Sequence, residues 1–233
     1  MKFEVKKIDG SILFEADIEC LHDDSYGVKL GLAIHWGYKN NKSLKYGDYR
    51  NSIFKYLTFD GSTFDGATFD GATFYGSTFN RATFYGATFY GATFYGATFY
   101  GATFYGATFY GATFYGATFD EKTLRNFKHD FWGVLIRYKN EVPALIEHIK
   151  NGKINGSCYS GECCCLMGTF AKIKNLNIED NQFSIKDASS PAEQWFTMIK
   201  PGDTPENNYA SKMALKWIEE FLMFDEGNNV QHR

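Results

Sequence analysis

A fixed five-residue period governs the apolar and polar positions between Leu57 and Glu121. The segment reads LTFDG, STFDG, ATFDG, ATFYG and STFNR, then ATFYG seven times, and closes with ATFDE. A period of five is neither the helical period of 3.6 nor the strand period of 2, so it predicts a solenoid whose units are buried by stacking on one another. In each unit after the first, Phe follows two positions after Ala or Ser, and these two positions can point into a narrow core.

The repeat resembles the pentapeptide repeat family, in which a small residue and a central Leu or Phe point inward. This resemblance implies a right-handed, four-sided β-helix with four pentapeptides, or 20 residues, in each coil. Phe54 with Ser52 extends the repeat toward the N-terminus, and Tyr49 with Gly47 fits it less well. Leu124 keeps the phase, although Lys122 takes the small position.

With 20 residues per coil, each residue stacks on the residue 20 positions later. The 15 units from Phe54 to Leu124 make 3.75 coils, or roughly 18 Å of stack at ~4.8 Å per strand. One internal column holds Phe59, Phe79, Phe99 and Phe119, and another holds Phe74, Phe94 and Phe114.

The outward position after each Phe changes along the stack from acidic to aromatic. The first acidic residues are Asp60, Asp65 and Asp70, and the later aromatic residues are Tyr75, Tyr85, Tyr90, Tyr95, Tyr100, Tyr105, Tyr110 and Tyr115. Tyrosine offers a wide and stiff contact area at low entropic cost, so these residues form a candidate protein-binding surface. Neighbour contacts that only stabilise the stack are the alternative, and identical Tyr columns leave a homodimer open.

The net charge of −3 over 233 residues gives no case for binding nucleic acid or membranes directly. Residues 57–121 carry one basic and five acidic side chains, so the repeats have a charge of −4. The five cysteines suit a reducing compartment. Neither a signal peptide nor a transmembrane run is evident, so the expected location is the cytoplasm of a bacterial host.

Three domains are predicted: an N-terminal hairpin-helix cap over 1–46, a pentapeptide-repeat β-helix over 47–126, and a mostly α-helical domain over 127–233. Asp9-Gly10 between two alternating segments predicts the hairpin. Asp23, Asp24 and Ser25 can cap a short helix over Val28 to Tyr38, in which Gly31 leaves room for close packing. A cap is needed because the open end of a β-helix exposes unpaired backbone groups.

Helical spacing of apolar residues recurs in the C-terminal part. Helices are expected from Phe127 to Leu135, from Pro143 to Ile149 and from Cys163 to Lys174, and short strands at Ile178 and Phe183–Ile185. Ser190-Pro191-Ala192-Glu193 is typical of a capping box, and Thr204-Pro205-Glu206 is expected to open a final helix with a buried stripe.

Cys158, Cys163, Cys164 and Cys165 form the one cluster that suggests metal binding or a thiol nucleophile. Three adjacent cysteines cannot all reach one ion from a regular element, and no second cysteine pair completes a zinc site. A nucleophile with His129 or His148 as its base has no third group to position it. Packing as small buried thiols is therefore preferred, and no cofactor or catalytic residue is predicted.

The layout also resembles phage and prophage proteins with pentapeptide repeats, through the segments GSCYSGEC at 156–163 and GDTPENN at 202–208. We therefore expect a non-enzymatic binding protein that engages or inhibits a host protein, for instance one of defence or nucleic-acid processing. The resemblance to members of the family that bind DNA gyrase by imitating DNA leaves a second hypothesis, but the acid here is confined to the ends of the stack. The Thr columns raise ice binding as a third, although bulky Tyr stands beside them.

Overall fold

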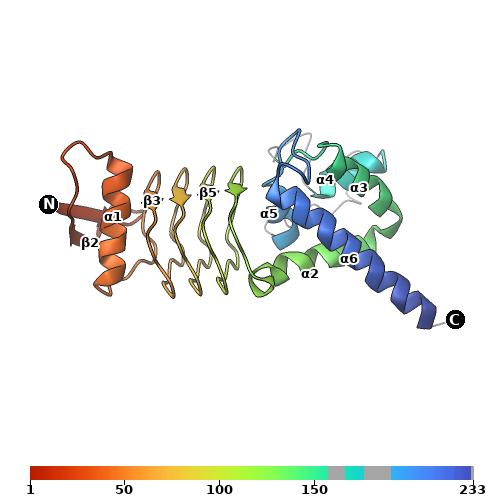
Figure 1. Cartoon of the computed structure of the whole chain (residues 1–233), viewed down its shortest axis with the longest axis horizontal. Helices are drawn as coiled ribbons and strands as arrows, with labels where there is room; N and C mark the ends of the chain where they lie inside the picture. The colour runs from red at the N-terminus through yellow and green to blue at the C-terminus, as the bar shows by residue number, and fades with distance from the viewer. Residues whose placement is uncertain (157–165, 176–189, 232–233) are drawn as a thin grey trace. The chain divides into compact units, whose positions relative to one another are not determined.

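The computed structural model describes residues 1–156, 166–175 and 190–231 (Figure 1). The chain divides into two compact units, Met1–Leu124 and Arg125–Arg233. The first unit holds the repeats with their N-terminal cap, and the second holds most of the helices.

Parallel coils of 20 residues form the body of the first unit. β3 (Ile53–Lys55), β4 (Thr73–Tyr75), β5 (Thr93–Tyr95) and β6 (Thr113–Tyr115) pair in this order along one side of the stack. Phe54 pairs with Phe74, and the other sides are joined by bridges such as Thr63 to Thr83. The repeat β-helix expected from the sequence is confirmed.

Stacked phenylalanine rings fill the interior of the coils. Phe59, Phe79 and Phe99 stack nearly parallel, with ring centroids 5.1 and 5.4 Å apart, and Phe99 lies 5.2 Å from Phe119. Around one coil the rings meet at steep angles, as between Phe74 and Phe79 at 74°. Offset stacking and edge-to-face contact are the two favoured aromatic geometries, and this core uses both.

Both ends of the stack differ from the expected ones. Backbone pairing already begins at Tyr46, whose N–H donates to the carbonyl oxygen of Asp65 at 2.9 Å, and Leu44 is buried at the first inward position. At the other end, Leu124 does not form a further repeat, because helix α2 begins at Glu121. Asp120 caps this helix by accepting from the Thr123 N–H at 2.8 Å.

The N-terminal cap is a hairpin with one helix. β1 (Lys2–Lys6) and β2 (Ile12–Asp17) pair antiparallel, and α1 (Tyr26–Lys39) follows. Of the three candidate caps Asp23, Asp24 and Ser25, it is Ser25 whose side chain accepts from the Val28 N–H. Figure 1 shows α1 lying beside β3 at the first coil. The helix thereby covers the end of the stack.

Glycine makes the close approach of α1 possible. A Cβ atom added to Gly31 would lie 2.1 Å from the carbonyl oxygen of Ile53, and one added to Gly27 would lie 2.4 Å from that of Asn51. These two glycines are one helical turn apart, so they leave a flat strip on which the backbone of the first coil rests.

The second unit is built from helices around an aromatic core. Its elements after α2 (Glu121–Arg137) are η1 (Lys139–Glu141), α3 (Val142–Lys150), α4 (Leu166–Ile173), α5 (Pro191–Phe196) and α6 (Tyr209–Gln231). Phe131 packs against Phe196, and Trp195 packs against Trp217 with ring centroids 4.7 Å apart. The stripe expected on the last helix is core, because Ala210, Ala214, Trp217, Ile218 and Phe221 are buried.

Two details of the second unit correct the sequence analysis. Ser190 caps α5 as expected, and the Glu193 carboxylate has partners that a capping box does not predict. It accepts from the N–H groups of Leu166 and Met167 at 3.2 and 2.9 Å, so it caps α4. The last helix begins at Tyr209 instead of Thr204, and the Ser211 N–H donates to the Asn208 side chain at its start. The strands expected at Ile178 and Phe183–Ile185 lie outside the described residues.

Candidate binding surface

Four outward columns run along the stack, each with one residue per coil at the position after the inward residue. The Lys55 column is Lys55, Tyr75, Tyr95 and Tyr115; the Asp60 column is Asp60, Asn80, Tyr100 and Asp120; the Lys45 column is Lys45, Asp65, Tyr85 and Tyr105; and the Arg50 column is Arg50, Asp70, Tyr90 and Tyr110. The predicted tyrosines and aspartates are therefore brought together in columns, as their 20-residue spacing requires.

The tyrosine rings differ in orientation between columns. In the Lys55 column Tyr75 and Tyr95 stack face to face, with centroids 4.9 Å apart and planes 3° apart. In the Lys45 column Tyr85 and Tyr105 are 48% and 68% exposed, and their planes are tilted by 51°. Tyr90 and Tyr110 of the Arg50 column are tilted in the same way, by 52°. These two columns therefore turn more of their ring faces outward.

The aspartates of the early coils are partly structural. Asp65 Oδ1 accepts from the Thr83 hydroxyl and from the Tyr85 N–H, at 2.9 and 3.2 Å. Asp70 Oδ1 accepts from Thr88 and from the Tyr90 N–H in the same way, at 2.7 and 3.0 Å. Each carboxylate thus satisfies polar groups of the next coil, a role that the sequence analysis missed.

Charge neutralisation further reduces the acidity of this surface. Lys45 Nζ lies 3.2 Å from Asp65 Oδ2, and Arg50 Nε donates to Asp48 at 2.7 Å. The ion pair leaves Asp65 little excess charge for a distant partner.

Tyrosine in the later coils supplies no such acceptor. Among the residues that the structure describes, the buried hydroxyls of Thr103 and Thr108, which lie one coil beyond Tyr85 and Tyr90, have no hydrogen-bond partner. In the Asp60 column, Asp60 accepts from the backbone N–H and the side-chain amide of Asn80, and Asn80 accepts from the Tyr100 N–H. Neither accepts from a Thr hydroxyl, and Thr78 and Thr98 also have no hydrogen-bond partner among the described residues. A buried polar group without a partner costs about 1–3 kcal/mol, so tyrosine at 85 and 90 has a stability cost.

Tyr85→Asn should recover part of this stability. The new side chain can accept from Thr103 and the Tyr105 N–H, as Asp65 does one coil earlier, but it loses the ring contact with Tyr105. Tyr85→Ala loses the same contact without providing an acceptor. In urea unfolding we expect the Asn variant to be about 1–2 kcal/mol more stable than the Ala variant. Equal stabilities would show that the acceptor at this position contributes nothing.

Two exposed tyrosines were missed by the sequence analysis, Tyr46 and Tyr56. Both occupy the glycine position of a repeat with positive φ, 59° and 55°. The Tyr46 ring lies over Gly66 and the Tyr56 ring over Gly76, so the later glycines leave room for them. A hydrogen bond with Tyr56 is the main reason that the pKa of Tyr75 is raised. The signal in the sequence is Tyr at a glycine position in LKY and FKY.

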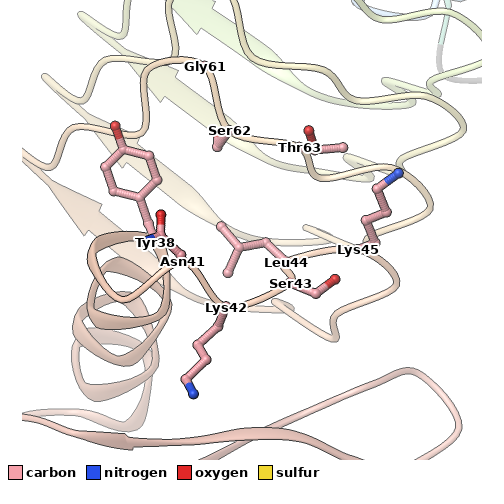
Figure 2. Close-up of a pocket in the computed structure, with 9 residues that line it drawn as sticks. All are labelled: Tyr38, Asn41, Lys42, Ser43, Leu44, Lys45, Gly61, Ser62 and Thr63. Carbon is pink, nitrogen blue, oxygen red and sulfur yellow. The ribbon is translucent and has the colours of Figure 1, made fainter.

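A pocket of about 290 Å³ lies between the end of α1 and the first coil (Figure 2). Three of its polar side chains are engaged within the unit: the Tyr38 hydroxyl donates to the Asp60 carbonyl oxygen at 2.9 Å, Ser62 donates to that of Phe59, and Lys45 pairs with Asp65. Lys42 extends away from Ser62 in Figure 2. Beside it, burial lowers the pKa of His35, so the packed cap favours the neutral imidazole.

The cysteine candidates Cys158, Cys163, Cys164 and Cys165 lie outside the described residues. Within the residues that are described, no three His, Cys, Asp or Glu side chains are grouped so as to hold a metal ion. The helices of the same residues include none with the length and apolarity needed to cross a membrane.

The 20-residue coil, the stacked phenylalanines and the outward columns define a β-solenoid built from five-residue units. Residues 50–103 and 79–123 match a family described as pentapeptide repeats (9 copies), so this part of the chain is a block of pentapeptide repeats. No curated protein matches the chain.

Several solved structures resemble the chain over part of its length. QnrB1, described as a plasmid-mediated fluoroquinolone resistance protein, is 25% identical with a TM-score of 0.29, over 30% of this chain and 37% of that one. A pentapeptide repeat protein from the Arabidopsis thaliana thylakoid lumen is 21% identical with a TM-score of 0.22, over 35% and 66%. Rfr23 from the cyanobacterium Cyanothece 51142 is 17% identical with a TM-score of 0.14, over 32% and 61%. Each likeness thus spans less than two thirds of the solved chain.

Proposed function

We propose that this chain is a non-enzymatic, phage-type binding protein whose tyrosine columns dock a protein of the bacterial host and inhibit it. The observation that carries the proposal is the replacement of acceptor side chains by exposed tyrosine. Asp65 and Asp70 stabilise the next coil, whereas Tyr85 and Tyr90 leave Thr103 and Thr108 without a partner. Residues that break a local stabilising pattern are typical of functional sites.

The composition of the surface supports a protein partner. Residues 82–119 carry no charged side chain, and their outward positions are Tyr, Thr and Gly. Tyrosine is enriched in the cores of protein interfaces, whereas charged residues are depleted there. Binding of nucleic acid would instead require a basic surface.

Imitation of duplex DNA is less well supported by this charge distribution. A DNA mimic needs negative charge along its length, at about one charge per 1.7 Å of axis. Here the later coils are uncharged up to Asp120, and Asp65 is paired with Lys45. A thiol- or metal-dependent activity of the cysteine cluster rests on sequence alone.

Affinity capture from a lysate of the bacterial host tests the proposal. We expect the wild-type chain to retain a specific protein, and Tyr90→Ala with Tyr110→Ala, or Tyr75→Ala with Tyr95→Ala, to reduce its recovery at least tenfold. Tyr26→Ala is the matched control, because Tyr26 is exposed on the cap and belongs to none of the columns. Recovery that neither double variant changes would exclude the columns and move the site to the second unit.

A further inference from the structure

The Lys45 and Arg50 columns share an order of residue types that is complementary to itself when reversed. From the first coil to the last, each reads base, aspartate, tyrosine, tyrosine: Lys45, Asp65, Tyr85, Tyr105 and Arg50, Asp70, Tyr90, Tyr110. Reversing such a column sets its first residue opposite the fourth and its second opposite the third. We propose that these columns form an antiparallel interface with a second copy of the chain.

The reversed arrangement sets complementary groups opposite each other in every row. Lys45 faces Tyr105 of the other copy and Arg50 faces Tyr110, and a cation over an aromatic ring is attractive. Asp65 faces Tyr85 of the other copy. Asp65 Oδ1 already accepts from Thr83 and Tyr85 of its own copy and Oδ2 pairs with Lys45, so the phenol would donate to the remaining acceptor site of Oδ2. Because the axis is twofold, each contact occurs twice.

A parallel pairing of two copies is disfavoured by the same residues. A twofold axis along the stack exchanges the two columns, so it would set Lys45 against Arg50 and Asp65 against Asp70 of the other copy, and like charges in contact repel. Charge therefore selects the antiparallel orientation.

The Asp60 column distinguishes the sides of the solenoid. Its reversal would set Asp60 against Asp120 of the other copy, which is repulsive. Its tyrosine, Tyr100, is 50% exposed, nearly the same as Tyr85 at 48%, so exposure alone does not separate the two columns. Tyr100 is therefore the matched control for Tyr85.

The spacing and the size of this surface set the expected strength. Both copies have the same strand spacing of ~4.8 Å, so the register of one row holds for all the rows. Four rows at this spacing are only ~19 Å tall, which is small against the ~800 Å² per partner of a standard interface. The dimer should consequently be weak, and a host protein that covers more surface would displace the second copy.

Sedimentation velocity of the purified full chain at roughly 1 to 500 µM tests self-association without any host protein, and therefore independently of the proposed function. We expect a dimer at the upper concentrations, a dissociation constant at least tenfold higher for Tyr85→Ala with Tyr90→Ala, and no change for Tyr100→Ala. A monomer throughout the range, or equal effects of the two sets of variants, would overturn the proposal. Circular dichroism of each variant confirms that the fold is kept.

Thiol cross-linking tests the orientation of the two copies. Lys45→Cys and Tyr105→Cys should form a cross-linked dimer when the two variants are mixed, above the background of the wild-type cysteines. Each variant alone should stay at that background. Cross-linking within the single variants would overturn the antiparallel assignment, and so would a dimer that is not cross-linked in the mixture.

Discussion

Phe79→Ala is expected to lower the free energy of unfolding of the first unit by about 3–5 kcal/mol, the usual cost of deleting a buried aromatic ring. Phe79 is fully buried in the second coil, and its ring contacts those of Phe54, Phe59, Phe64, Phe74, Phe84 and Phe99. Two of these rings, Phe59 and Phe99, are in its own column and four are in neighbouring columns. Substitution with Ala therefore opens a cavity bordered on several sides.

The rigidity of the coil backbone prevents the cavity from closing. The Phe79 N–H donates to the Thr98 carbonyl oxygen at 2.8 Å, and the Thr78 N–H donates to that of Leu57 at 2.9 Å. Moving the chain inward would break these bonds. Urea unfolding followed by circular dichroism measures the effect, and in a solenoid a defect in the middle of the stack weakens both of its neighbours.

Phe79→Leu is the control, because the substitution keeps most of the apolar volume and should cost less than about 1.5 kcal/mol. Phe114→Ala provides a second comparison. Phe114 is half-buried in the last coil, so its removal should cost less than removal of Phe79. Equal losses at the two positions would mean that the stack is not packed more tightly at its centre.

The sequence predicted the interior of the solenoid because inward residues repeat without exception from Phe54 to Phe119. A stacked core requires this regularity, so the 20-residue columns follow from the period alone. The first coil was only partly recognised, because Lys42 stands at its small position and Tyr46 at its glycine position. The α1 cap covers that end, and the consensus is relaxed there.

At the opposite end of the stack, the five-residue period continues into residues that form a helix. Leu124 keeps the phase of the repeats, but Asp120 and Thr123 together form a helix cap, and local capping determines the structure. The Glu193 carboxylate illustrates a second limit. It is in phase for a capping box, yet it caps α4, an element more than twenty residues earlier, and no local pattern indicates such a partner.

The residues of the candidate surface were predicted from the sequence, but the hydrogen bonds that some of them make to the next coil were not. Spacing placed the tyrosines on columns, whereas the hydrogen bonds from Asp65 to Thr83 and from Asp70 to Thr88 depend on side-chain directions in adjacent coils. The sequence analysis treated acid and tyrosine as one graded surface. In the structure they have different roles. The aspartates accept hydrogen bonds from the next coil, whereas the tyrosines leave Thr hydroxyls of the next coil without a partner.

Gly31→Ala is expected to have the second large effect, a loss of about 2–3 kcal/mol that is specific to the N-terminal cap. The new Cβ would lie 2.1 Å from the carbonyl oxygen of Ile53, which is backbone held by the pairing of β3 with β4. Relief requires α1 to move off the first coil, and such overpacking costs 1–3 kcal/mol or more. Ala is a better helix former than Gly by about 1 kcal/mol, so helix propensity alone would stabilise the variant. A lower free energy of unfolding must therefore come from the steric clash.

Gly133→Ala in α2 tests helix propensity without a steric clash, because nothing lies within 4 Å of its added Cβ. This variant should be more stable than the wild type by up to about 1 kcal/mol, while Gly31→Ala should be less stable. Trp36 in α1 packs against Phe14, so its fluorescence reports release of the cap. Hydrogen exchange should also rise over residues 26–39 in Gly31→Ala. If Gly31→Ala were as stable as Gly133→Ala, the helix could not rest on the first coil as closely as Gly27 and Gly31 allow.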